Sequence, residues 1–341
     1  MNQRNIELPV QESLVSIVIP TYNGERYLKQ AIDSVLQQSY LNWELIICDD
    51  CSQDATKILL EAYNKLPQIQ VYFNPENLGL FPNLNQCIEY CQGDYIMILQ
   101  QDDRFLPESL AVNLQLMESY PDADLILTPQ NVIDSNEKLI PGEHANSLFF
   151  KNLKIQSKLL EPNETVPLLL QYGSIAGSLT GYFFRRELYN KIGSFKDNWK
   201  YAADWEWLYR VSNCSKILVS KTNGNLVRWH DEQVSKNVNF NLNKYIEAIE
   251  VVNMLLASPF VNKVDSALDW ALNNMEPNLW LALKLIFLGR FIDAWAIINA
   301  VSKSTGFFNI FCFLLKKLPQ RLIDGLSKEF SISRNETRVE K

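Results

Sequence analysis

The chain of 341 residues lacks a long apolar run and an excess of basic charge. Its net charge of -7, without a basic stripe and interleaved aromatic residues, argues against binding to nucleic acid. Residues 1–7 lack the apolar core of a signal peptide, so we expect a cytoplasmic protein. No run reaches the roughly 20 apolar residues that a membrane-spanning helix needs. These absences predict an enzyme that is not embedded in a membrane.

Cysteine and histidine are also scarce, with six and two residues. Without a secretory signal we expect the cysteines to be reduced thiols. Cys48 and Cys51, together with Cys87 and Cys91, have spacings that suggest a zinc site. However, Cys48 falls in an apolar strand and the last two share one helical face, which favours small buried side chains over metal ligands.

Two adjacent carboxylates, Asp102 and Asp103, follow the apolar run 95–99. Such a run predicts a buried strand, and ligands in open α/β sheets collect at the carboxyl ends of strands. Oxygen ligands there select magnesium-like ions, which usually bring phosphates with them. The alternative is that Asp103 caps a helix beginning near Pro107.

Strand and helix patterns alternate through the first hundred residues. Buried strands are predicted at 14–19, 43–48, 69–73 and 95–99, with helical spacing between them, including a helix over 83–91. The economical topology is a parallel sheet with right-handed crossovers. The loops that carry Tyr22, Asp50 and the two aspartates would then lie along one edge of the sheet.

Six blocks of sequence occur in a fixed order between residues 14 and 235: VSIVIPTYNGERYLKQAIDSVLQQSY, WELIICDDCSQDAT, NPENLGLFPNLNQ, GDYIMILQQDD, GYFFRRELYNKIGSFKDNWKYAADWEWLYRV and RWHDEQVS. Together they closely resemble the inverting family 2 of the glycosyltransferases. The resemblance implies the GT-A fold, a Rossmann-like and mostly parallel sheet flanked by helices. We therefore expect a catalytic domain over 1–238 and a helical extension over 239–341.

The resemblance also implies a binding site for a nucleoside diphosphate sugar, which we expect to be a UDP-sugar. The residues at the matching positions are Pro20, Thr21, Tyr22, Asp50, Asn85, Asp102 and Arg228. Tyr22 offers a ring on which the nucleobase stacks, and Asp50 matches the carboxylate that binds the uracil ring nitrogen. Arg228 would neutralise the phosphates.

Asp102 and Asp103 match the end of the family's DxD motif, which holds the ribose and a divalent ion, Mn²⁺ or Mg²⁺. The first aspartate of that motif falls on Gln100, which carries no charge, so the prediction shifts the metal to Asp103. His230 matches a loop that closes over the donor diphosphate and is predicted as a further metal ligand. The alternative for His230 is an ordinary surface loop.

Asp204 matches the family's catalytic base. An inverting transfer needs one carboxylate that takes the proton of the acceptor hydroxyl, and the flanking Trp205 and Trp207 would raise its pKa by desolvation. Glu206 is a distant second candidate, because Ala203 stands where relatives often have an acid. The alternative is that Asp204 only caps the helix that follows.

Beyond Asn239 the pattern is helical, with a predicted hairpin broken at Gly289 and Arg290. Apolar residues over 307–315 precede Lys316 and Lys317. An apolar face beside basic residues suits the headgroup region of a membrane, here its inner face. The alternative is an extension packed on the catalytic domain.

The sequence therefore predicts a metal-dependent inverting glycosyltransferase. We expect its acceptor to be a glycan or a lipid-linked saccharide in surface polysaccharide biosynthesis. A sugar nucleotidyltransferase would share the sheet and the metal, but the loop after the first strand has no glycine-rich, basic phosphate-binding run. An inactive sugar-nucleotide-binding scaffold is the other alternative.

Overall fold

The computed structural model describes residues 13–144, 147–222, 224–230 and 241–319. In this part of the chain the main sheet has the strand order β3-β2-β1-β4-β10-β6-β11-β9. Its strands, in chain order, are β1 (Val15–Thr21), β2 (Trp43–Asp49), β3 (Ile69–Phe73), β4 (Tyr95–Ile98), β6 (Leu125–Leu127), β9 (Ser157–Leu160), β10 (Phe183–Arg185) and β11 (Ile217–Ser220). The first four run parallel, as predicted. Strand β10 runs antiparallel between β4 and β6, and β9 runs antiparallel to β11.

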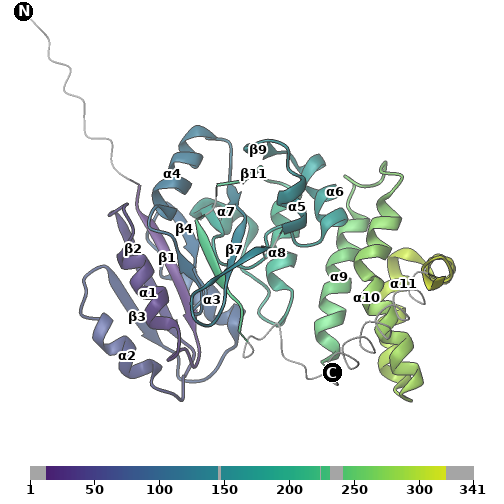
Figure 1. Cartoon of the computed structure of the whole chain (residues 1–341), viewed down its shortest axis with the longest axis horizontal. Helices are drawn as coiled ribbons and strands as arrows, with labels where there is room; N and C mark the ends of the chain where they lie inside the picture. The colour runs from purple at the N-terminus through teal and green to yellow at the C-terminus, as the bar shows by residue number, and fades with distance from the viewer. Residues whose placement is uncertain (1–12, 145–146, 223, 231–240, 320–341) are drawn as a thin grey trace, which may run out of the picture.

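Helices cover both faces of this sheet (Figure 1). The bounds of the first four are α1 (Leu28–Leu36), α2 (Thr56–Tyr63), α3 (Leu80–Glu89) and α4 (Ser109–Ser119). Side chains alternate along β1, so that Val18 enters one core cluster with α3, while Ile17 and Ile19 enter the other with α1 and α4. Burial on both faces explains why the strands are apolar throughout rather than alternating.

A smaller sheet, with the order β5-β12-β7-β8, fixes the loop that carries the two aspartates. Its strands are β5 (Arg104–Phe105), β7 (Gln130–Ile133), β8 (Leu139–His144) and β12 (Asn225–Arg228). Strand β5 follows Asp103 directly and pairs with β12. The N-cap of α4 is Glu108, so the alternative that Asp103 caps this helix is wrong.

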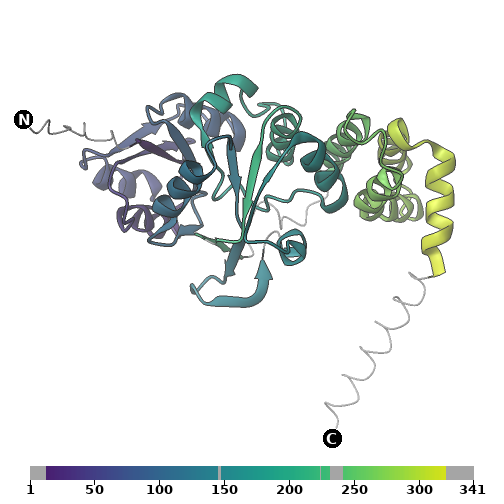
Figure 2. The same cartoon turned by 90° about the horizontal axis from the view of Figure 1, so that it is seen from above.

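The remaining helices are α5 (Ser147–Asn152), α6 (Pro162–Tyr172), α7 (Arg186–Ile192), α8 (Ala203–Ser212), α9 (Leu242–Ala257), α10 (Ala267–Phe287), α11 (Phe291–Thr305) and a last helix, Phe307–Pro319. Of these, the helices from α9 onward extend the molecule at the end opposite β3 (Figures 1 and 2). The predicted break of the hairpin is confirmed, because Gly289 adopts a φ of 73° between α10 and α11.

The C-terminal helices share a core with the part of the chain that forms the main sheet. Helix α9 packs on α8, and α10 packs on α6. A single apolar cluster continues from Val18 in β1 to Phe313 in the last helix. The predicted boundary at 238/239 lies outside the described residues, and the division into two domains stays a prediction.

No single helix in the described segments has the length and apolar composition needed to cross a membrane. Helix α11 and the helix Phe307–Pro319 have the required length and apolar composition only when they are taken together, and the two helices are bent by 106° relative to each other. The bend occurs at Gly306, whose φ is 75°.

Candidate active site

The turn after β1 presents an exposed aromatic ring. Gln101 fixes this turn, because its side chain accepts a hydrogen bond from the backbone N–H of Tyr22 (2.9 Å) and donates one to the carbonyl of Tyr22 (3.1 Å). The hydroxyl of Thr21 donates to the same Gln101 oxygen. A Cβ at Gly24 would lie 2.7 Å from that oxygen, which explains the glycine. The Tyr22 side chain remains 43% exposed, as a stacking platform requires.

Asp50 lies beside this turn, and its backbone N–H donates to the carbonyl of Thr21. The carboxylate is almost completely buried and accepts hydrogen bonds from Asn74 Nδ2 and from the N–H groups of Leu78 and Gly79, at 2.8 to 2.9 Å. Asp50 therefore holds the loop that leads into α3. Its predicted contact with the nucleobase stays a prediction.

The two adjacent aspartates point into different environments. Asp103 is only 1% exposed and accepts hydrogen bonds from the Thr180 hydroxyl and from the Arg228 N–H (2.8 Å). Burial, together with the charge of Asp102, raises the pKa of Asp103. These contacts disagree with the prediction of Asp103 as the metal ligand, because both of its oxygens are committed to the protein interior.

Asp102 instead pairs with the predicted ligand His230, at 3.0 Å between Oδ2 and Nε2. Two neighbouring ligands of an octahedral ion with bonds of about 2.1 Å also lie about 3 Å apart, so this spacing fits Mn²⁺ or Mg²⁺. His230 Nδ1 is buried and has no hydrogen-bond partner among the described residues. The same residues contain no group of three histidine, cysteine or acidic side chains that suits a metal, so phosphate and water oxygens would complete the coordination.

Arg228 does not face the open site. Its side chain is fully buried, and its guanidinium donates to the carbonyls of Asp102 (2.8 Å) and Asp134 (3.1 Å). It also donates to Gln30 Oε1 and lies 4.5 Å from the ring centroid of Tyr27. This geometry disagrees with the predicted phosphate contact, because the Arg228 guanidinium is hydrogen-bonded to buried groups, including the carbonyl of Asp102.

Two further residues predicted to contact the donor are buried. Asn85 is buried in α3, where its oxygen accepts from Phe195 N–H and the Tyr189 hydroxyl, and its amide donates to Asp197. Pro20 lies within β1 in a fully buried row. Neither side chain is exposed in this structure, so their predicted contacts with the donor stay predictions.

Asp204 lies in the first turn of α8 and is partly exposed. Burial raises its pKa to about 6, although the N–H groups of Trp205 and of Asp204 itself oppose this shift. The N-cap of α8 is Ala202, so Asp204 is not the helix cap and that alternative is wrong. A carboxylate with this pKa suits a general base near neutral pH.

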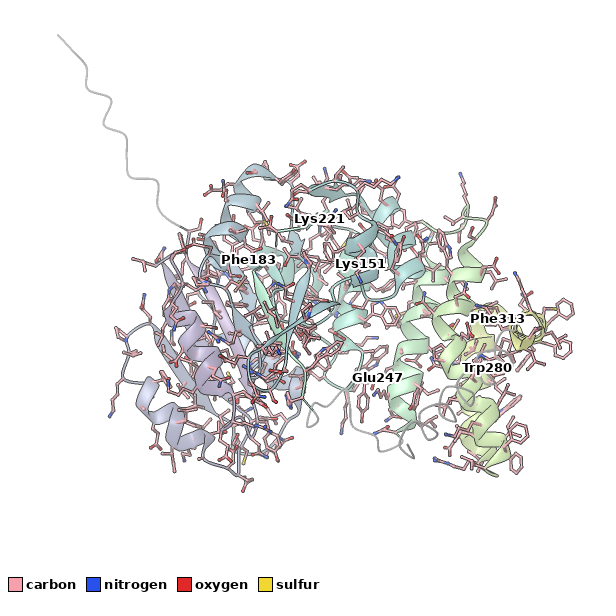
Figure 3. The ribbon with its side chains drawn as sticks, viewed as in Figure 1. Lys151, Phe183, Lys221, Glu247, Trp280 and Phe313 are labelled. Carbon is pink, nitrogen blue, oxygen red and sulfur yellow. The ribbon has the colours of Figure 1, made fainter. Side chains whose placement is uncertain are left out.

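Glu247 in α9 closes the end of α8 in place of a local cap (Figure 3). Its buried carboxylate accepts hydrogen bonds from the N–H groups of Lys200 (3.0 Å), Tyr201 (2.7 Å) and Ala202 (2.9 Å). The charge of Glu247 also contributes to the raised pKa of Asp204. A helix beyond the six sequence blocks therefore positions residues 200–202, which lead into the helix that carries the predicted base.

Glu206, the second candidate for the base, is enclosed by cations. Its carboxylate is almost completely buried and lies 3.1 Å from Arg210 Nη2 and 3.4 Å from Lys196 Nζ. Arg210 in turn donates to the carbonyls of Ile192 and Ser194. This network ties α8 to the end of α7, which is a structural role.

The segment 178–182 connects the aspartate loop with Asp204. The Ser178 hydroxyl donates to Gln100 Oε1, and the Thr180 hydroxyl donates to Asp103. Two residues later, burial and the charge of Asp204 raise the pKa of Tyr182. The part of the last sequence block at 231–235 lies outside the described residues.

The family model of Glycosyl transferase family 2 matches residues 16–193. A putative teichuronic acid biosynthesis glycosyltransferase of Bacillus subtilis is 39% identical over 105 residues, covering 30% of this chain and 42% of that protein. An uncharacterized glycosyltransferase of Rickettsia typhi is 28% identical over 234 residues, covering 68% and 69%.

An uncharacterized protein of Sinorhizobium fredii is 32% identical over 200 residues, covering 58% of this chain. The chain spans about a fifth of that protein and about two fifths of the Bacillus relative.

Among solved structures, S. aureus TarS 1-349 in complex with UDP-GlcNAc has a TM-score of 0.61 at 20% identity, covering 84% of this chain and 81% of TarS. That likeness shows the fold. The family match spans more than half of the chain, over the strands and loops described above. The chain therefore belongs to Glycosyl transferase family 2.

Proposed function

We propose that the protein transfers a sugar, with inversion, from a UDP-sugar to a hydroxyl of a glycan or lipid-linked saccharide in surface polysaccharide biosynthesis. The observation that carries this proposal is the partly buried Asp204, whose raised pKa of about 6 suits a base. The relative named for teichuronic acid biosynthesis and the UDP-GlcNAc complex of TarS support the pathway and the donor.

Each side chain has a separate task in this proposal. Tyr22 stacks on the nucleobase, and Asp102 with His230 would hold Mn²⁺ or Mg²⁺. A bound ion neutralises charge on the departing diphosphate. Asp204 accepts the acceptor's proton while the acceptor oxygen bonds to the anomeric carbon. The bond from that carbon to the diphosphate breaks on the opposite face, and its electron pair leaves with UDP.

The two alternatives from other classes are less well supported. A nucleotidyltransferase needs donors for a triphosphate after the first strand, whereas Asn23, Gly24 and Glu25 in this turn bind the neighbouring loop 52–56. An inactive scaffold has no need for a carboxylate with a raised pKa at this place.

A donor screen tests the proposed reaction. The protein is incubated with UDP-, GDP- and dTDP-sugars, with Mn²⁺ or with EDTA, and release of the nucleoside diphosphate is measured. We expect release from a UDP-sugar that EDTA reduces at least tenfold, because the ion stabilises the leaving group. Release of pyrophosphate from a nucleoside triphosphate and a sugar phosphate would identify a nucleotidyltransferase instead, and no turnover of any donor would favour the scaffold.

Removing the exposed ring of Tyr22 should weaken donor binding. We expect Tyr22→Ala to raise the donor KM roughly tenfold while kcat at saturation changes little, because stacking is shared by ground and transition states. Tyr90→Ala is the matched control, since Tyr90 is 41% exposed at the far end of α3. Initial rates across donor concentrations check both variants, and an unchanged KM in Tyr22→Ala would remove Tyr22 from the donor site.

A further inference from the structure

The end of α10 and the last two helices carry a large apolar surface that no part of the described chain covers. Six of its side chains define what we call the terminal surface: Phe287, Phe291, Ile292, Trp295, Phe308 and Phe311. Their exposed fractions run from 60% to 89%. Single exposed apolar residues are ordinary, but a contiguous group of large ones marks an interaction site.

These side chains are contiguous across the bend between the two helices. In α11, Trp295 lies four residues after Phe291 and three after Ile292, so it is a neighbour of both on one side of the helix. Phe308 and Phe311 share a face of the following helix in the same way. The rings of Trp295 and Phe307 stack at 5.8 Å between centroids, which joins the two faces.

The opposite sides of the same helices already fill the core. Ala294, Ile297 and Val301 of α11 are buried, and so are Ile310 and Phe313 of the last helix. Figure 3 places Phe313 and Trp280 at this end of the molecule. The terminal surface is therefore a second apolar face on helices whose first face is occupied, so packing on the catalytic part does not account for it.

The charged residues near the terminal surface are mostly cations, which indicates a negatively charged partner. Residues 284–318 contain five lysines and arginines and one aspartate, in a chain whose net charge is -7. Arg290 pairs with Asp293, and Lys317 pairs with Glu276. The remaining cations, Lys284, Lys303 and Lys316, are exposed and have no carboxylate partner among the described residues.

We propose that the terminal surface lies in the headgroup region of a bilayer that contains anionic lipids. Apolar rings beside unpaired lysines fit this environment, because the rings enter the acyl boundary and the lysines meet lipid phosphates. A second copy of the chain fits less well, since two such surfaces in contact would bring like charges together. The last helices lie at the end of the molecule opposite β3 (Figures 1 and 2), so bilayer contact at that end leaves the ends of β1 and β2 open to the donor. This inference does not depend on the proposed sugar transfer.

Vesicle sedimentation tests this proposal on the full chain. Vesicles of phosphatidylcholine are compared with vesicles that also contain phosphatidylglycerol, at low and high salt. We expect partitioning to the anionic vesicles that falls at least tenfold in the triple variant Phe291→Ser, Ile292→Ser, Phe308→Ser. Leu41→Ser with Ile58→Ser is the matched control, because both residues are 74% exposed far from this surface and should not affect binding.

A second variant, Lys284→Glu with Lys303→Glu and Lys316→Glu, leaves the apolar face intact. It should lose the preference for phosphatidylglycerol and the salt dependence. UDP binding and thermal melting, measured on every variant, report folding separately from lipid contact. Failure of the folded wild type to sediment with either vesicle overturns the proposal. So does a dimer, seen by light scattering, that the serine variant dissociates while vesicle binding is absent.

Discussion

Asp204→Asn should leave the protein folded and able to bind UDP with Mn²⁺, yet reduce transfer by on the order of a hundredfold or more. The amide keeps the size of the carboxylate and its place in the first turn of α8. It cannot accept the proton of the attacking hydroxyl, so the acceptor oxygen must attack while still protonated. Steady-state rates at saturating donor, with UDP affinity from calorimetry, check this result.

The pH dependence gives the same residue a second test. Because the pKa of Asp204 is about 6, wild-type kcat should decline as the pH falls through 6, where the base becomes protonated. The charge of Glu247 is one cause of this raised pKa. A wild-type kcat that stays constant down to pH 5 would contradict the assignment.

The free energy of unfolding should change with pH in the direction opposite to kcat. The folded pKa of about 6 lies above the unfolded value of about 3.9, so the folded state binds more protons between these values. The free energy of unfolding therefore falls as the pH rises from about 4 to 6. Asp204→Asn has no carboxylate to ionise, so this pH-dependent loss of stability is absent from the variant. At pH 8 its Tm should therefore equal or exceed that of the wild type. Below pH 4, where the wild-type carboxyl is protonated, the variant should no longer have the higher Tm.

Glu206→Gln is the matched control, because Glu206 is two residues away and also a buried acid. We expect it to retain most of the transfer activity but to lower the Tm, since it leaves Arg210 and Lys196 without their carboxylate. Near-normal turnover in a folded Asp204→Asn enzyme would remove Asp204 from the mechanism.

The sequence predicted the sheet well because its strands depend on local patterns. The apolar runs over 14–19, 43–48, 69–73 and 95–99 became β1 to β4, and the loops after β1, β2 and β4 meet at one edge. Matching positions along the chain do not determine where a side chain points. Asp102 and Asp103 are neighbours, yet one is open and the other is buried.

Residues that act through long-range contacts were not predictable. Arg228 and Asn85 belong to matching blocks, but the structure shows their side chains hydrogen-bonded to the protein backbone. Gln101 fixes the turn at Tyr22, but its uncharged side chain belongs to no pattern that would mark it in the sequence. Glu247 lies outside every matching block, and only the packing of α9 on α8 brings it to the base.

Asp102 and Asp103 are neighbours in the sequence but differ in their access to a metal ion. We propose that Asp102, and not Asp103, holds the ion, because Asp102 is 21% exposed beside His230 while Asp103 faces Thr180 and Arg228. Asp102→Asn should therefore weaken UDP binding in Mn²⁺ by tenfold to a hundredfold and leave binding in EDTA almost unchanged. Transfer should fall at least as far.

Asp103→Asn is the matched partner of that variant. Its amide oxygen can still accept the hydrogen bond from the Arg228 N–H, but a buried network is disturbed, so we expect a lower Tm and a much smaller change in Mn²⁺-dependent UDP affinity. Calorimetric titration of UDP with Mn²⁺ and with EDTA, at a temperature where both variants are folded, separates the two effects. If Asp103→Asn lost the metal dependence and Asp102→Asn kept it, the ion would belong to Asp103, and the loop would have to turn that carboxylate outward when the donor binds.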